Sequence, residues 1–363
     1  MKLIAQVKLL PGPDQHDALK RTLEQVNAAA NHISRYAWQN RVFRQYDLHH
    51  ALYYDIRETF GLSAQVVVRV LAKVADAYKL DRKHARIFQP HGSIAYDKRI
   101  LSWKLDARTV SIWTVNGRET IPFVAGEHHL ALLATMQGEA DLVYRRGSFY
   151  LFQTCEVEEP PTDEVDEFLG IDLGVVNVAV DSDGTIYSGA EVNAVRHRHA
   201  RLRAKLQRKG TRSAKRRLKA LSGKEARFAT HTNHTISKRI VAAAKDTGRG
   251  IALEDLKGIR DRVRLRRAQR AALHSWSFHQ LRSFLEYKAC RAGVPLVTVD
   301  PRNTSRECPA CGHIDKANRP SQSTFSCVAC GFSGLADHIA AGNISRRAVV
   351  SLPHIPDAPS STA

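Results

Sequence analysis

The sequence contains no long apolar run, and this absence limits what the protein can be. No stretch approaches the roughly 18 uncharged apolar residues that a membrane-spanning helix needs. The first residues, MKLIAQVKLLPGPDQHD, hold too short an apolar segment for a secretory signal and no small-residue cleavage site. We therefore expect a soluble, cytoplasmic protein without a membrane partner. The length of 363 residues predicts two or three domains, at roughly 150 residues for each.

Cysteine is scarce, and four of the six cysteines are grouped. Cys155 and Cys290 stand alone, as is typical of small buried apolar residues. The other four follow C-x2-C-x15-C-x2-C, the spacing of a four-thiolate zinc site: Cys308, Cys311, Cys327 and Cys330. A cytoplasmic chain would not normally pair such cysteines as disulfides. The spacing therefore predicts one structural Zn²⁺, and with four cysteines present we do not assign His313 or His338 as ligands.

Acidic residues are rare in parts of the second half, which carries the whole net charge of +19. Residues 1–167 hold 21 basic and 21 acidic residues, whereas residues 168–363 hold 34 basic and 15 acidic residues. Within 196–227, 14 lysines and arginines accompany a single acidic residue, and a second arginine cluster spans 260–270. Such a field attracts polyanions, most commonly nucleic acid inside a cell, although a basic run can also be a solvated helix face. The candidate nucleic-acid-binding residues are Arg212, Lys215, Arg216, Arg217, Arg262, Arg264, Arg266 and Arg267.

The first part of the chain predicts an antiparallel barrel with inserted helices. Residues 2–10 alternate as a strand, and Asp14 is expected to cap a helix over about 15–46. Further helices are expected over 47–60 and 62–80. Short strands separated by turn residues are then expected at 93–96, 99–104, 109–114, 119–124, 129–135, 140–145 and 148–157. Their number and spacing favour a barrel, which the first strand would complete.

The second half predicts an α/β domain that follows an acidic, proline-containing linker. Residues 168–180 are expected to form one continuous apolar strand, followed by a hairpin turn and a strand at 185–188. Two long helices are expected over 191–245, separated near Gly210 or Gly223. The remaining elements expected are strands at 250–254 and 294–299 and helices at 271–292 and 336–349. In the helix at 271–292, Trp276 and Phe278 fit a core face better than a base-stacking site.

Three acidic residues lie in apolar surroundings, where burial of a lone carboxylate is costly. Asp172 lies inside FLGIDLGVVNVAV, Glu254 ends the apolar strand of GIALEDL, and Asp337 begins the last helix. The order of the elements is that of an RNase H-like fold, which gathers carboxylates from its first strand, its fourth strand and a late helix. Three carboxylates at one point hold two Mg²⁺ ions, with Mn²⁺ as the alternative, for phosphodiester hydrolysis.

Each carboxylate also has a competing interpretation. An Asp in an apolar strand can be purely structural, and GIDLG resembles the first phosphate loop of actin-like and chaperone ATPases. That fold needs a second D-x-G loop and a glycine-rich adenosine motif, and we find neither convincingly. Asp255 competes directly with Glu254, and the strand alternation leaves both residues open.

The strings GIDLGVVNVAV, IALEDLKGIR, TSRECPACG, FSCVACG and ADHIAAGNI resemble the three RuvC motifs and the zinc segment of TnpB proteins. TnpB proteins are RNA-guided nucleases encoded by insertion sequences, and they are similar to the ancestors of compact type V CRISPR effectors. The close match covers about 168–346. The resemblance favours Glu254 over Asp255 and implies a RuvC site of Asp172, Glu254 and Asp337 that holds two Mg²⁺ ions. It also implies a guide RNA from the transposon end, a double-stranded DNA target and a place at the nucleoid.

The resemblance further implies a multidomain α+β architecture. An antiparallel β-barrel, the wedge, contains an inserted helical recognition unit, and a RuvC/RNase H-like α/β nuclease domain with an inserted zinc segment follows. The boundaries we expect are 1–12 and 88–160 for the wedge, 13–87 for the recognition domain, 161–167 for the linker, 168–303 and 334–350 for the RuvC domain, 304–333 for the zinc segment and 351–363 for a disordered tail. The expected function is RNA-guided DNA cleavage. The alternatives are an RNA-guided DNA-binding repressor and a strand-transfer transposase of the same fold.

Overall fold

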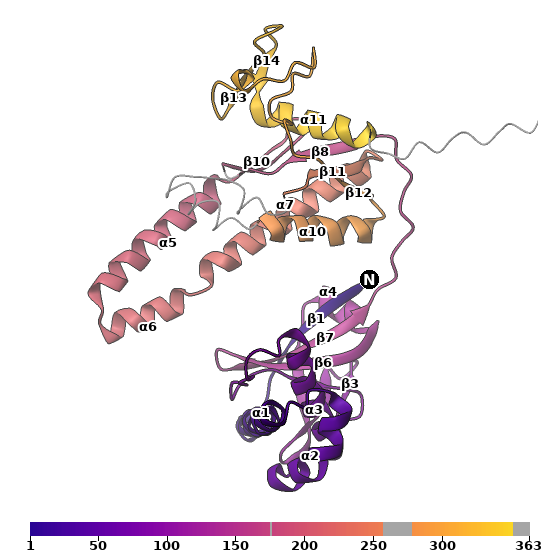
Figure 1. Cartoon of the computed structure of the whole chain (residues 1–363), viewed down its shortest axis with the longest axis vertical. Helices are drawn as coiled ribbons and strands as arrows, with labels where there is room; N and C mark the ends of the chain where they lie inside the picture. The colour runs from indigo at the N-terminus through magenta and orange to yellow at the C-terminus, as the bar shows by residue number, and fades with distance from the viewer. Residues whose placement is uncertain (175, 257–277, 351–363) are drawn as a thin grey trace, which may run out of the picture. The chain divides into compact units, whose positions relative to one another are not determined.

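The computed structural model describes residues 1–174, 176–256 and 278–350, and the chain divides into two compact units (Figure 1). Unit 1 comprises Met1–Glu158, and unit 2 comprises Glu159–Ala363. Each unit buries apolar side chains of its own: one core cluster lies in unit 1, and three smaller clusters lie in unit 2. Within the described ranges, none of the helices combines the length and the apolar composition needed to cross a membrane.

Unit 1 is built on a seven-stranded antiparallel sheet in the order β2-β6-β7-β1-β5-β4-β3. The strands are β1 (Lys2–Leu9), β2 (Ile94–Tyr96), β3 (Leu101–Lys104), β4 (Thr109–Thr114), β5 (Gly117–Val124), β6 (Met136–Arg145) and β7 (Ser148–Glu156). β1 lies in the middle, between β7 and β5, which confirms that the first strand completes the sheet. β2 and β3 form the two edges, and the Tyr96 hydroxyl of β2 donates to the Trp113 carbonyl of β4 at 3.0 Å. The expected barrel is therefore a nearly closed sheet.

Three helices connect β1 to β2: α1 (Pro13–Asn40), α2 (Gln45–Phe60) and α3 (Ala64–Leu80). The N-cap of α1 is Gly12 rather than Asp14, because proline is favoured at the first helical position. The helix expected to reach residue 46 ends at Asn40, because Arg41 adopts a left-handed conformation (φ 58°) and its N–H bonds to the Ala37 carbonyl. The inner faces of these helices belong to the same core as the sheet.

One predicted strand of unit 1 is wrong. Residues 129–135 contain most of α4, a helix over Glu127–Leu133 with Gly126 as its N-cap. The segment HHLALL is too short for periodicity to separate helix from strand, and its leucines and alanine favour a helix. Leu132 and Leu133 are buried, and the His129 ring accepts a hydrogen bond from the backbone N–H of Gln6 at 3.3 Å. The contact with β1 therefore decides an ambiguous local pattern.

Unit 2 is built on a five-stranded mixed sheet in the order β10-β9-β8-β11-β12. The strands are β8 (Phe168–Asp172), β9 (Asn177–Asp181), β10 (Ile186–Ser188), β11 (Gly250–Glu254) and β12 (Leu296–Val299). β8, β11 and β12 are parallel, whereas β9 and β10 are antiparallel to their neighbours. The single strand expected over 168–180 is wrong, because the chain folds back after Asp172 and places Val180 opposite it. Both strands are buried, so the apolar run gives no sign of the turn between them.

Helices cover both faces of this sheet (Figure 1). They are α5 (Ala190–Lys209), α6 (Arg212–Leu221), α7 (Lys224–Asp246), α10 (Phe278–Ala292) and α11 (Ala336–Val350). α7 and α10 pack on one face and α11 packs on the other. The two helices expected over 191–245 are three, because Gly210 (φ 64°) and Gly223 (φ 77°) both take the left-handed conformation and separate helices. Residues 271–277 of the expected helix and the expected tail at 351–363 lie outside the described residues.

Candidate active site and metal centre

Two of the predicted carboxylates lie at the carboxyl ends of neighbouring parallel strands. The register of β8 and β11 pairs Ile171 with Leu253, so the next residues, Asp172 and Glu254, lie side by side on the same face of the sheet. Asp337 lies in the first turn of α11 and is close enough to influence the ionisation of Asp172. The structure thus brings together three carboxylates from two strands and a helix.

The helix that carries Asp337 approaches β8 very closely. A Cβ atom on Gly170 would overlap the Ala341 carbonyl oxygen of α11 and would lie 2.5 Å from the Ser345 backbone nitrogen. Only glycine fits at this position, because any side chain would force the helix away from the strand. The Ser345 hydroxyl donates to the Phe168 carbonyl at 2.6 Å and fixes the same contact. This close packing carries Asp337 to the end of β8.

Two of these carboxyl groups, Asp172 and Glu254, have raised pKa values, mainly because they are buried. Burial raises the pKa of Asp172 to about 7, and the negative charges of Glu254 and Asp337 add to this effect, whereas Arg319 opposes it. Burial also raises the pKa of Glu254, against a hydrogen bond from the Thr304 hydroxyl that lowers it. Carboxylates brought together in a buried place favour a bound cation, which would relieve both burial and repulsion.

Three residues that the sequence did not predict contact these carboxylates. Arg319 donates to Asp337 Oδ1 at 3.2 Å, and Asn177 donates to Asp337 Oδ2 at 3.1 Å. Thr304 donates through its hydroxyl to Glu254 Oε1. Arg319 and Thr304 both belong to the segment that contains the cysteines, far from β8 and β11 in the sequence. No periodicity or spacing could identify them, because only the tertiary fold brings them to the carboxylates.

Asp255, the competitor of Glu254, has different surroundings. Its Oδ1 accepts a hydrogen bond from Arg282 at 3.2 Å, and this arginine also binds Glu286 in the following turn of α10. Glu254 instead lies beside Asp172 in the strand register. The strand register therefore places Glu254, rather than Asp255, next to Asp172.

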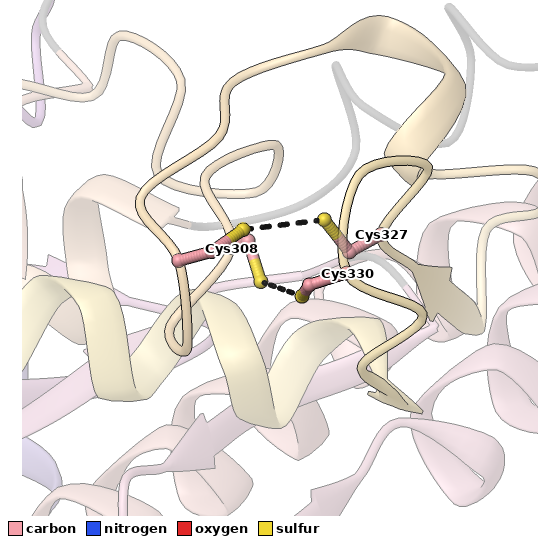
Figure 2. A group of neighbouring side chains, drawn as sticks. Cys308, Cys327 and Cys330 are labelled. Atoms are coloured by element: carbon pink, nitrogen blue, oxygen red, sulfur yellow. Dashed lines mark hydrogen bonds between the residues drawn. The ribbon is translucent and has the colours of Figure 1, made fainter.

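The four grouped cysteines converge on one point from two loops (Figure 2). Their sulfur atoms all lie within 4.8 Å of one another, and the pairs Cys308–Cys330 and Cys311–Cys327 are 3.6 Å apart. A disulfide would bring two sulfurs to about 2.05 Å, whereas tetrahedral zinc with bonds of about 2.3 Å separates its sulfurs by about 3.8 Å. The donors thus fit Zn²⁺. Among the described residues this cluster consists of cysteines, and His313 and His338 are not members.

The cysteine loops are two matching knuckles joined by a buried amide. Gly312 and Gly331 follow the second cysteine of each pair with φ angles of 73° and 74°, which glycine adopts without strain. Asn318 is fully buried. Its side chain donates to the His313 carbonyl of the first knuckle at 3.0 Å and accepts from the Val328 N–H of the second knuckle at 3.0 Å. The chain's own hydrogen bonds therefore preform the arrangement of the four thiols.

The predicted nucleic-acid-binding residues divide into two groups. α5 and α6 form a helical arm that extends away from the sheet of unit 2 (Figure 1). Four predicted residues lie exposed on α6: Arg212, Lys215, Arg216 and Arg217. The other four lie outside the described residues: Arg262, Arg264, Arg266 and Arg267. The four predicted residues that the structure describes thus project into solvent.

Two family models match the second half of the chain. The OrfB_IS605 model, described as a probable transposase, matches residues 152–258. The model of the Cas12f1-like TNB domain matches residues 278–344. The first match includes Asp172 and Glu254, and the second includes Asp337 together with the four cysteines.

Curated relatives share this region. Cas12f1 of Sulfoacidibacillus thermotolerans, a CRISPR-associated endodeoxyribonuclease, is 34% identical over 220 residues, which cover 55% of this chain and 50% of that protein. The TnpB-like protein MJ0751 of Methanocaldococcus jannaschii is 28% identical over 195 residues, covering 50% of this chain and 69% of that protein. InsQ of Escherichia coli, a putative RNA-guided DNA endonuclease, is 28% identical over 221 residues, covering 54% and 53%. The chain spans about half the length of the first of these relatives.

Solved structures show the same fold. The chain is similar to Cas12f1 in its complex with sgRNA and target DNA, with a TM-score of 0.60 and 14% identity, over 90% of this chain and 82% of that chain. It is also similar to the mini-RNA-guided endonuclease CRISPR-Cas_phi3, with a TM-score of 0.59 and 10% identity, over 97% and 93%. The fold and the sequence matches define a class that includes TnpB-like proteins and Cas12f endodeoxyribonucleases. Within this class, the chain is similar to TnpB-like proteins over about half its length.

Proposed function

We propose that the protein is an RNA-guided DNA endonuclease that hydrolyses phosphodiesters at Asp172, Glu254 and Asp337. The observation that supports this proposal is the position of Asp172 and Glu254 at the adjacent ends of β8 and β11, with Asp337 of α11 near enough to raise the pKa of Asp172. The sheet order of unit 2, with its second strand antiparallel, is that of RNase H-like domains of the RuvC type. The names of the curated relatives, which include endodeoxyribonucleases, support the same reaction.

The three carboxylates would hold two Mg²⁺ ions, or Mn²⁺ in their place. Oxygen donors of this kind suit hard divalent cations, which activate water and stabilise the leaving oxygen of a phosphodiester when bound. β8 and β11 fix Asp172 and Glu254 in one register, and the close packing of α11 fixes Asp337. Arg319 and Asn177 each hold one oxygen of Asp337, so that its carboxylate plane is set before substrate arrives. The protein thus contributes a preformed arrangement of oxygen ligands.

The remainder of the chain would bind nucleic acid. In RNA-guided enzymes, base pairing supplies sequence recognition, and the protein recognises shape, backbone and a short flanking motif. The exposed basic arm of unit 2 would hold phosphates of the guide RNA from the transposon end or of its duplex with DNA. In unit 1, we assign the sheet to the wedge (1–12 and 88–160) and the three helices to the recognition domain (13–87). The cysteine knuckles would hold one structural Zn²⁺.

Single alanine substitutions test the proposed active site. Asp172→Ala, Glu254→Ala and Asp337→Ala should each abolish cleavage of a guided target and leave RNA and target binding largely unchanged, because the carboxylates would hold metal rather than nucleic acid. Asp255→Ala is the matched control and should retain cleavage, because Asp255 pairs with Arg282 instead. Ca²⁺ should support binding without turnover, since its coordination geometry is looser.

The same assay separates the proposal from its alternatives. Cleavage by the Asp172→Ala protein at near the wild-type rate would refute the proposed site. An unmodified protein that binds RNA and target but leaves the DNA intact in Mg²⁺ would be an RNA-guided binding protein. Binding to terminal repeats without RNA would instead indicate a strand-transfer transposase. Sequencing of the nucleic acid that copurifies with the protein gives the first indication.

A further inference from the structure

The cysteine segment begins at a threonine that contacts the proposed active site. Thr304 is 2% exposed, and its hydroxyl donates to Glu254 Oε1. This contact occupies one carboxylate oxygen of Glu254 and leaves the other oxygen available to the site. The same hydroxyl lies 3.2 Å from the Pro301 carbonyl, which belongs to the loop after β12. A residue of the cysteine segment therefore fixes the orientation of a carboxylate on the central sheet.

Thr304 is in turn held by the helix that carries Asp337. Asn343, six residues after Asp337 on α11, is 1% exposed, and its amide donates to the Thr304 carbonyl at 2.7 Å and to the Glu307 carbonyl at 2.9 Å. α11 thus positions two of the three carboxylates. It carries Asp337 directly, and it holds Glu254 in place through the backbone of Thr304.

The anchored residues lead directly into the first cysteine knuckle. Glu307 precedes Cys308, and its carboxylate pairs with Arg347 of α11 at 2.5 Å. The Asn318 amide, which joins the two knuckles, also donates to the Arg306 carbonyl at 2.8 Å. A continuous set of hydrogen bonds therefore runs from the four-cysteine cluster through residues 304–307 to Glu254.

We propose that Thr304, held by Asn343, is a positioning residue that orients the Glu254 carboxylate for metal binding and links the cysteine segment to the active site. The proposal rests on the proposed function of the three carboxylates. Groups that hydrogen-bond to metal ligands orient them, and their loss typically lowers metal affinity or activity about 10–100-fold. The competing view is that Thr304 only stabilises the fold, in which case its hydroxyl affects the melting temperature and leaves metal affinity unchanged.

Substitutions at Thr304 separate the two views. Thr304→Val keeps the shape of the side chain and removes the donor, whereas Thr304→Ser keeps the donor. Thr298→Val is the matched control, because Thr298 is an exposed threonine on the adjacent strand β12. Mn²⁺ affinity is measured on the full-length protein by electron paramagnetic resonance, with the Asp172→Ala protein as the blank. Zinc content and guide RNA binding are measured in parallel.

Thr304→Val should bind Mn²⁺ about 10–100-fold more weakly than wild type and need correspondingly more Mg²⁺ for half-maximal cleavage, with zinc content and RNA binding unchanged. Thr304→Ser and Thr298→Val should stay within about twofold of wild type. Wild-type Mn²⁺ affinity in Thr304→Val would overturn the proposal. Should this variant fail to fold, Thr304→Ala, which adds no bulk, decides by the same criterion.

The proposed function and this inference fail in different ways. If Asp172→Ala cleaves DNA like wild type, the proposed active site is wrong whatever Thr304 does. If Asp172→Ala is inactive and Thr304→Val binds Mn²⁺ like wild type, the active site stands and only the positioning role is refuted. If Thr304→Val loses both zinc and Mn²⁺ while Thr304→Ala keeps both, the hydroxyl has no positioning role.

Discussion

The basic arm allows a quantitative test of nucleic-acid binding. Arg212, Lys215 and Arg216 lie at i, i+3 and i+4 on α6, on the side of the helix opposite the buried Ala214. All three are exposed, and within the described parts of the chain none of their side chains has a hydrogen bond or an ion pair. Their combined replacement by glutamine removes three charges and leaves the contact between α5 and α6 intact. Arg203→Gln is the matched control, because Arg203 on α5 is already paired.

The expected effect follows from counterion release. Each lost phosphate contact should flatten the slope of log affinity against log salt by about 0.7–0.9, so three contacts predict a change of about 2–3. The affinity ratio between wild type and the triple variant should therefore shrink about 20–40-fold between roughly 0.05 M and 0.2 M salt. Arg203 binds Glu225 at 2.6 Å, so the control should leave the slope nearly unchanged.

Filter binding across a salt series measures this slope for the guide RNA and for an RNA–DNA duplex. Identical slopes for wild type and the triple variant would refute the assignment and show that the charge of α6 is a solvated surface. A change in the preferred flanking motif would also contradict it, because phosphate contacts position a protein without specifying sequence.

Two further predictions concern the cysteine cluster and a buried lysine. Freshly reduced protein should contain about one zinc, lost in Cys308→Ser and in Cys330→Ser with destabilisation of the segment; elemental analysis showing no metal in wild type would contradict this. Burial lowers the pKa of Lys73 from 10.5 to about 8, although its ammonium donates to Asn27 and Ser93 at 2.7 Å. The unfolded chain keeps the Lys73 proton up to a higher pH than the folded protein does. The free energy of unfolding of wild type, relative to that of Lys73→Met, should therefore rise from about pH 8 to 10.5, by at most about 3 kcal/mol. Denaturation of both proteins across this range measures the difference, and a constant difference would contradict the prediction.

The sequence predicts those parts of the molecule whose signals are local. The spacing of the cysteines requires only short loops, and the structure brings the four sulfurs together. The sequence also predicts that Glu254 ends an apolar strand, whereas it places Asp172 inside a longer one. β8 in fact ends at Asp172, and parallel strands bring such ends to one edge of a sheet. The roles of Asp172 and Glu254 as metal ligands remain predictions that the alanine variants test.

Features that depend on tertiary contacts could not be predicted in this way. The turn after Asp172 lies between two strands that are buried except at the residues beside the turn, so the apolar run continues across it. α4 has a pattern that a helix and a strand satisfy equally well over so few residues. Thr304 begins the string TSRECPACG and Arg319 lies between the two cysteine pairs, but no spacing there indicates that either residue reaches the carboxylates across the fold.

The close contact at Gly170 has a consequence for exchanging parts between relatives. Because α11 lies directly on the backbone of β8, the strand and the helix can be transplanted only as a matched pair. A chimera can take the strand from one homologue and the helix from another. It keeps its cluster of carboxylates only if the strand has glycine at the position of Gly170 and the helix packs directly against it. Recombination between family members is therefore expected to succeed at the loops of unit 2 and to fail at breakpoints that separate residues 168–172 from residues 336–350.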